Sequence, residues 1–375
     1  SHFDKIASNS TKWEAQYYAA YSNLLLGVGK KDQESKDELF SKALKYVKKA
    51  DSTNANNSEI NTLKGYIVFM QMSVYPQQRA MSLIPEANTL FEKAIALDPE
   101  NPRPYLLKGI SLFYVPAMFG GDKEQAKVVL TTAKAKFDKY TAKSLQLNWG
   151  KAKAEELLKQ LREEEIERLL AQLQGRCEKM LAMQIAVKDG TVALDKIITG
   201  NPDKKSSRAE DQKALELSDK EDEISKEANK ALTLIEAEGS AVAFAEVFKQ
   251  VLGDMNTTAG RLRRADVGEV TVAIEDDIID ALKEMVAALK KARKDNQEPK
   301  PPMPPMPPSS GGMPPDQKLI DMIAELKMIR SMQIRVNNRT TIYGKQIEGE
   351  QVVGVVGGVV VGQQQQFGRG LEGGV

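Results

Sequence analysis

The chain has 375 residues, more than one ordinary hydrophobic core takes up, so we expect two or more domains. Its 53 Lys and Arg residues balance 52 Asp and Glu residues, and the net charge of +1 gives no electrostatic reason to expect a nucleic-acid partner. One histidine, His2, and one cysteine, Cys177, leave no basis for a histidine-ligated metal site, a histidine-based catalytic triad or an internal disulfide. We therefore predict no enzyme activity, no cofactor and no metal.

The N-terminal part carries a repeated pattern of small residues around a larger one. Ala43, Val47 and Ala50 have counterparts in Ala87, Phe91 and Ala94 and in Ala126, Leu130 and Ala133. The same interval separates Ala43 from Gly65 and Ala87 from Gly109. Small residues let two helices approach closely, so the pattern predicts helical pairs over about residues 11–140 and a closing helix at 148–161.

The stretch ANTLFEKAIALDPENPRPYLLKG (87–109) resembles the tetratricopeptide repeat, a helical pair of about 34 residues. The matching positions are Ala87, Phe91, Ala94, Pro99, Tyr105 and Gly109. Two insertions depart from the family pattern and predict long, irregular turns: SVYPQQRAMSLIP before Ala87 and VPAMFGGD before Ala126.

Four stretches also resemble a Bacteroidota-type family of envelope tetratricopeptide-repeat proteins: WEAQYYAAY, NNSEINTLKGY, ENPRPYLLKGISLFYVPAMFGGDKEQA and NWGKAKAEELL. This resemblance implies an exported, non-enzymatic protein of the periplasm or cell envelope. The opening SHFDKIASNS has no initiator Met; removal of a signal peptide would leave such a start, and so would trimming of the chain at its N-terminus.

Tetratricopeptide-repeat proteins bind extended peptides or partner helices along the inner face of their first helices. Transferred to this chain, the resemblance predicts a mostly aromatic and aliphatic partner-binding face. Arg103 is its one residue suited to a carboxylate clamp. The alternative is that these side chains pack against the neighbouring repeat or the closing helix. The predicted face comprises Glu59, Thr62, Tyr66, Phe69, Met70, Arg103, Leu106, Ile110, Phe113 and Tyr114.

From residue 151 the apolar residues follow alternating steps of three and four, which is typical of long packed helices. One such seam runs from Ile166 through Cys177 to Ile198, and three more helices are predicted over 207–237, 240–263 and 267–293. Short connections between them make antiparallel neighbours, so we expect a helical bundle or an elongated array of helical hairpins. Cys177 is predicted to be buried and inert. The acidic run Glu275, Asp276, Asp277 and Asp280 is predicted to face outward.

This second half resembles an uncharacterised planctomycete-type family of helical proteins over about residues 160–345. The stretches that carry the resemblance are AEVFKQVLGDMNTTAGRLRRADVGEVTVAIEDDIIDALKEMVAALKKA and LIDMIAELKMIRSMQIRVNNRT. We associate that family with gene neighbourhoods that encode proton-channel motors. The two halves thus resemble families of different bacterial groups, as expected of a natural fusion, a chimera or a composite chain.

The segment PKPPMPPMPPSSGGMPP (299–315) predicts a polyproline II spacer, with a ligand for an aromatic-lined groove as the alternative. The apolar helix that follows needs a partner. We expect it to fold back on the bundle; docking on another chain and contact with a membrane surface are the alternatives. The Gly-, Val- and Gln-rich end predicts disorder or a short exposed strand.

Together these patterns predict an all-α fold and a non-catalytic scaffold for protein–protein interaction in the bacterial envelope. A self-assembling structural subunit is the alternative, and an accessory to a proton-channel-driven envelope complex is the third hypothesis. No apolar run is long enough for a transmembrane helix. The predicted domains are a tetratricopeptide-like array at 1–161, a long-helix bundle at 162–296, a Pro-rich linker at 297–315, an apolar helix at 316–345 and a low-complexity tail at 346–375.

Overall fold

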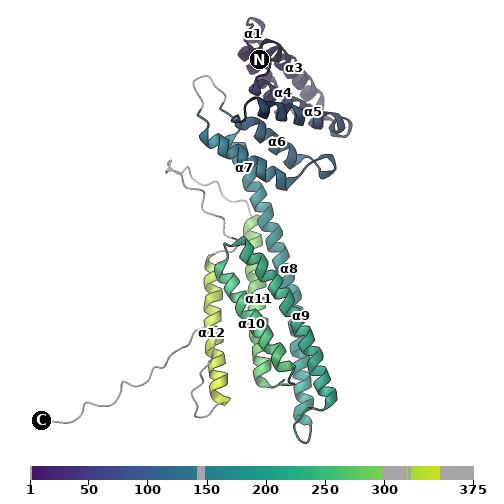
Figure 1. Ribbon diagram of the computed structural model, residues 1–375, viewed down its shortest axis with the longest axis vertical. Helices are drawn as coiled ribbons and strands as arrows, with labels where there is room; N and C mark the ends of the chain where they lie inside the picture. Colours follow the sequence, from purple (N-terminus) through teal and green to yellow (C-terminus); the bar gives the residue numbers. More distant parts are fainter. Residues whose placement is uncertain (1, 142–147, 298–318, 320–321, 347–375) are drawn as a thin grey trace, which may run out of the picture. The chain divides into compact units, whose positions relative to one another are not determined.

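The computed structural model describes residues 2–141, 148–297, 319 and 322–346. Within this part of the chain every regular element is a helix and no strand occurs, which confirms the all-α prediction. The chain divides into two compact units, Ser1–Glu165 and Ile166–Val375 (Figure 1). Apart from Gln297 and Gln346, the predicted linker and tail lie outside the described residues.

The first unit is a succession of helical pairs. Within each pair the two helices pack against each other, and the second helix of one pair packs against the first helix of the next. A short N-terminal helix precedes the pairs, and the beginning of a long helix follows them. The elements are α1 (His2–Ser8), α2 (Trp13–Val28) with α3 (Gln33–Thr53), α4 (Ser58–Val74) with α5 (Pro76–Leu97), α6 (Pro102–Tyr114) with α7 (Lys123–Lys139), a 3-10 turn η1 (Ala117–Phe119) and α8 (Lys151–Gly200).

Polar side chains fix where these helices begin. Asp32, Asn57, Asn101 and Asp122 each precede a helix, and each accepts a hydrogen bond from a first-turn backbone N–H. Such caps satisfy amides that have no partner inside the helix. The turns between helices are therefore set by local sequence, and the first helices α4 and α6 start at defined residues.

A glycine in the first helix of each pair faces a large side chain of the second. Gly27 lies against Phe40, Gly65 against Phe91 and Gly109 against Leu130. A Cβ atom built on any of these glycines would lie only 2.5–2.6 Å from the facing side chain. The glycines that mark the repeated pattern thus allow the two helices of each pair to approach closely.

Replacing Gly65 with alanine is expected to destabilise the first unit by about 1–3 kcal/mol, because the new methyl group overlaps the Phe91 ring. Gly29→Ala is the matched control, since its φ of −76° suits alanine and its nearest atoms are 3.7 Å away. Urea unfolding followed by tryptophan fluorescence measures both. Equal stability of the two variants would contradict the packing role of Gly65.

The two insertions behave differently. Residues 76–85 are helical and lengthen α5, so only Tyr75 separates α4 from α5, and the predicted long turn is wrong there. Pro76 sits in the first turn of α5, where proline costs no hydrogen bond. The second insertion does form an irregular turn around η1. The predicted closing helix begins at Lys151 and continues to Gly200 through Gly175 and Gly190.

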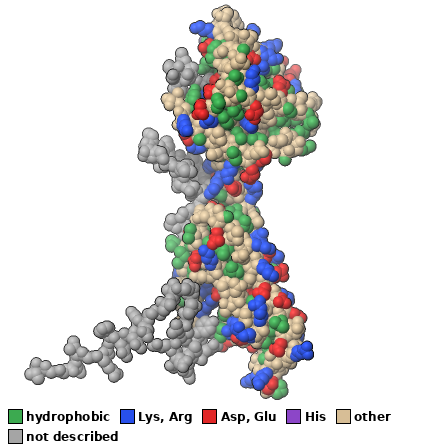
Figure 2. Space-filling model, in the orientation of Figure 1, with side chains coloured by type: hydrophobic (Ala, Val, Ile, Leu, Met, Phe, Trp, Pro, Cys, Tyr) green, Lys and Arg blue, Asp and Glu red, His purple; other side chains and the backbone are tan. Residues whose placement is uncertain are grey.

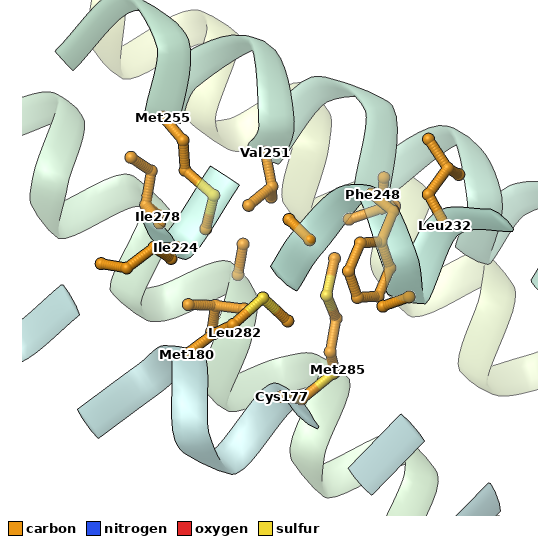
Figure 3. Close-up of a cluster of buried hydrophobic side chains, with 14 of the residues drawn as sticks. Cys177, Met180, Ile224, Leu232, Phe248, Val251, Met255, Ile278, Leu282 and Met285 are labelled. Atoms are coloured by element: carbon orange, nitrogen blue, oxygen red, sulfur yellow. The ribbon is translucent and has the colours of Figure 1, made fainter. Parts of the chain in front are cut away.

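The second unit is built from long helices around one hydrophobic core. The later part of α8 packs with α9 (Arg208–Glu238), α10 (Val242–Leu262) and α11 (Glu269–Gln297). Figure 3 shows core side chains from all four helices, among them Met180, Ile224, Phe248 and Met285. Cys177 belongs to this core and is fully buried, as predicted.

Helix α12 (Met322–Gln346) packs on α10 and α11. The Arg339 guanidinium donates to both carboxylate oxygens of Asp254 on α10, at 2.6 and 2.7 Å, and to Asp277 on α11 at 2.6 Å. Met328 is buried in the same contact. Among the described residues no helix is long and apolar enough to cross a membrane. On the face in Figure 2, basic and acidic side chains are interspersed.

Candidate functional site

A buried ion pair joins the first turns of α4 and α6. Asn101 caps α6 and Pro102 follows it, which places Arg103 in the first turn. The Arg103 side chain is fully buried, and its Nη1 donates to Glu59 Oε1 at 2.9 Å. Burial raises the pKa of Glu59, and the charge of Arg103 partly offsets that rise. Arg103 therefore holds the Glu59 carboxylate between the first turns of α4 and α6.

Aromatic rings lie against the Arg103 guanidinium of this ion pair. The Arg103 guanidinium carbon lies 4.7 Å from the ring centre of Tyr140 and 5.5 Å from that of Trp149. Trp149 also stacks on Tyr21 of α2 and Tyr66 of α4, with ring centres 5.6 and 6.2 Å apart. A cation between aromatic faces is stabilised by the ring quadrupoles. We call Tyr21, Tyr66, Tyr140 and Trp149 the aromatic cluster.

Gly150 places Trp149 in the aromatic cluster. Its φ of +108° lies in the left-handed region that glycine adopts without strain. A Cβ atom at this position would lie 2.7 Å from the Phe137 ring and 2.8 Å from Leu106. The chain thus turns tightly just before α8, and Trp149 precedes the helix rather than lying on it.

The ten residues of the predicted partner face do not share one environment. Thr62, Phe69, Arg103 and Leu106 are buried, and Thr62 Oγ1 donates to the Ser58 carbonyl at 2.7 Å. These four side chains are packed inside the first unit and are not accessible to a partner. Glu59 is held by Arg103. The half-buried or exposed members are Tyr66, Met70, Ile110, Phe113 and Tyr114.

Four of these five outward members border the same hydrophobic cores as Trp149, and Tyr66 stacks on its ring. Tyr66, Met70, Ile110 and Trp149 border the hydrophobic core under α4 and α5. Ile110, Phe113 and Trp149 also border the core under α6 and α7. Phe113 makes an edge contact with Tyr114, which is 54% exposed. The sequence pattern missed Tyr140 and Trp149, because both lie between α7 and α8, outside the first helices of the pairs. It missed Tyr21 because the face was predicted from the second and third pairs alone; Tyr21 stands six residues before Gly27, as Glu59 and Arg103 stand before Gly65 and Gly109.

The second unit contains a buried polar cluster of its own. Gln184 Nε2 on α8 donates to Glu221 Oε2 on α9 at 2.8 Å. Glu275 on α11 is fully buried, so the prediction that the acidic run faces outward is wrong at this residue. Burial raises the pKa of Glu221 to about 8 and that of Glu275 to about 7.

The contacts of Glu275 agree with a protonated carboxyl. Thr191 Oγ1 lies 3.1 Å from the Val187 carbonyl oxygen and 2.7 Å from Glu275 Oε1. A hydroxyl has a single hydrogen, so both contacts are satisfied when Thr191 donates to Val187 and a protonated Glu275 donates to Thr191. Across the described ranges no group of His, Cys, Asp and Glu side chains is placed to hold a metal ion.

Comparison with known proteins gives one similarity. No protein-family model matches the sequence, and no curated protein matches it. Among solved structures the chain is similar to the HusA haemophore from Porphyromonas gingivalis, with 30% sequence identity and a TM-score of 0.40. The similarity covers 44% of this chain and 81% of that protein.

Proposed function

We propose that this protein is a non-catalytic scaffold of the bacterial envelope whose helical pairs bind a peptide or helix of a partner protein. The observation that carries the proposal is that half-buried aromatic and aliphatic side chains from α4 and α6 border the same hydrophobic cores as Trp149. Side chains of this kind dominate the anchoring regions of protein interfaces.

The partner surface is defined by the side chains that remain accessible. Met70, Phe113 and Tyr114 are the outward members that lie outside the aromatic cluster, together with Ile110 between them. The aromatic cluster and the Arg103–Glu59 pair lie beside them and keep α4 and α6 in register. A rigid, preformed apolar surface reduces the entropy lost when a partner binds. The envelope location rests on the resemblance of the N-terminal stretches to envelope repeat proteins.

The test compares two double variants of the full chain in capture of partners from the envelope fraction of producing cells. Met70→Ser/Tyr114→Ser changes the proposed surface and is expected to lose at least tenfold of the captured partner, since each truncated anchor costs about 1 kcal/mol or more. Met81→Ser/Val128→Ser changes two exposed apolar residues on the second helices α5 and α7 and is expected to capture as the wild type does. Equal capture by both variants would contradict the proposed surface.

A further inference from the structure

Helix α12 carries an apolar face that its packing leaves uncovered. Its inner side meets α10 and α11 through Met328, Arg335 and Arg339. The opposite side presents large apolar side chains that are 40–58% exposed. We call the following residues the outer face of α12: Leu326, Lys327, Ile329, Arg330, Ile334 and Val336.

The charges of α12 are divided between its two sides. Arg335 lies 3.7 Å from Glu284, and Arg339 pairs with Asp254 and Asp277, so the inner cations are neutralised by the bundle. Lys327 and Arg330 make no ion pair or hydrogen bond with any of the described residues. The single acidic residue of α12, Glu325, is half-buried. The outer face is therefore both apolar and positively charged.

The outer face is also broad. With 3.6 residues per turn, the exposed apolar residues from Val336 to Ile334 span about 160° of the helix circumference. A partner helix meets a narrower seam with apolar residues at every third and fourth position. Symmetric pairing of the outer face with that of a second copy would bring two positive faces together without a neutralising acid. The width of the outer face and its positive charge both favour binding to an extended, negatively charged surface.

We propose that the outer face of α12 binds the headgroup region of an anionic lipid surface. Leu326, Ile329, Ile334 and Val336 enter the boundary between headgroups and acyl chains, and Lys327 and Arg330 lie against lipid phosphates. This is how amphipathic helices with a cationic rim bind membranes from one side. The helix lies on the surface and does not cross it, and its inner side stays on α10 and α11. The proposal is independent of the partner surface on α4 and α6.

Co-sedimentation of the full chain with lipid vesicles tests the proposal. Wild type is expected to bind vesicles made of equal parts phosphatidylglycerol and phosphatidylcholine, to bind phosphatidylcholine vesicles far less, and to lose binding as salt is raised. Leu326→Ser/Ile329→Ser and Lys327→Gln/Arg330→Gln are each expected to weaken binding about tenfold. The control is Lys213→Gln/Leu215→Ser, which changes an exposed cation and an exposed apolar residue on α9 and is expected to leave binding unchanged.

Three results would overturn the proposal. The first is equal sedimentation of wild type with both kinds of vesicle. The second is a loss of binding by the α9 control as large as that of the α12 variants. The third is binding to an acidic polypeptide such as polyglutamate without binding to anionic vesicles, which would assign the outer face to an acidic protein. The Lys327→Gln/Arg330→Gln variant keeps every described contact of α12, so loss of folding does not mask its result.

Discussion

Arg103→Met is expected to cost the first unit about 3–5 kcal/mol of stability, because Glu59 then stays in an enclosed site without its cation. The substitution also removes the cation from between Tyr140 and Trp149. Of the single substitutions considered in the first unit, we expect this one to have the largest effect. The loss of stability comes mainly from leaving the Glu59 carboxylate unpaired, rather than from losing a favourable ion pair.

The double variant Glu59→Gln/Arg103→Met separates these two causes. It carries no buried charge, so we expect it to recover more than half of the stability that Arg103→Met loses. Both tryptophans, Trp13 and Trp149, belong to the first unit, so tryptophan fluorescence in urea follows the unfolding of that unit alone. If the double variant is no more stable than Arg103→Met, the lost stability comes from the aromatic contacts of Arg103 and not from the unpaired charge of Glu59.

The second unit is expected to lose stability as the pH rises from about 5 to about 8. Burial raises the pKa of Glu221 to about 8, above the ordinary value of 4.5, so the folded state binds this proton more tightly than the unfolded state. The stabilisation is complete below the unfolded pKa and is lost as the pH approaches the folded pKa. The loss for Glu221 is on the order of 3 kcal/mol. Glu275 adds a smaller loss in the same direction.

Glu221→Gln is expected to remove most of this pH dependence and to make the second unit more stable than wild type at pH 8. Glutamine keeps an acceptor for Gln184 Nε2 and has no charge to bury. Glu223→Gln, an exposed neighbour on α9, is the matched control and is expected to retain the wild-type slope. The measurement is urea unfolding by far-UV circular dichroism across this pH range, with tryptophan fluorescence marking the first unit. A wild-type slope of the opposite sign would rule out neutral burial of Glu221.

Periodicity predicts most of the helices because burial on one side leaves a direct signal in sequence. The helices expected over 207–237, 240–263 and 267–293 are observed as α9, α10 and α11, with ends that differ by a few residues. The first insertion was misread because Pro76 and Pro85 suggest a turn. Pro76 occupies a first turn, where proline is tolerated, and α5 continues through Pro85.

The candidate site is less visible in sequence because it depends on residues far apart in the chain. Arg103 and Glu59 were placed on the predicted face, but their pairing depends on the packing of α4 beside α6. Trp149 reaches the aromatic cluster through the positive φ of Gly150, for which the helical pattern has no signal. Glu275 looked exposed because it stands in a run of acids, yet helix geometry turns it toward Thr191 while Asp276 stays outside.

Because Cys177 is buried, its rate of alkylation reports how often the helical bundle of the second unit opens. This thiol is the chain's single cysteine, it is fully buried, and burial raises its pKa to about 12. Only the thiolate reacts rapidly with alkylating reagents, so the closed bundle protects Cys177 both by exclusion and by protonation. Every alkylation event must therefore pass through an opened bundle. The alkylation rate of the wild-type chain therefore measures how often the bundle opens, and no label has to be introduced.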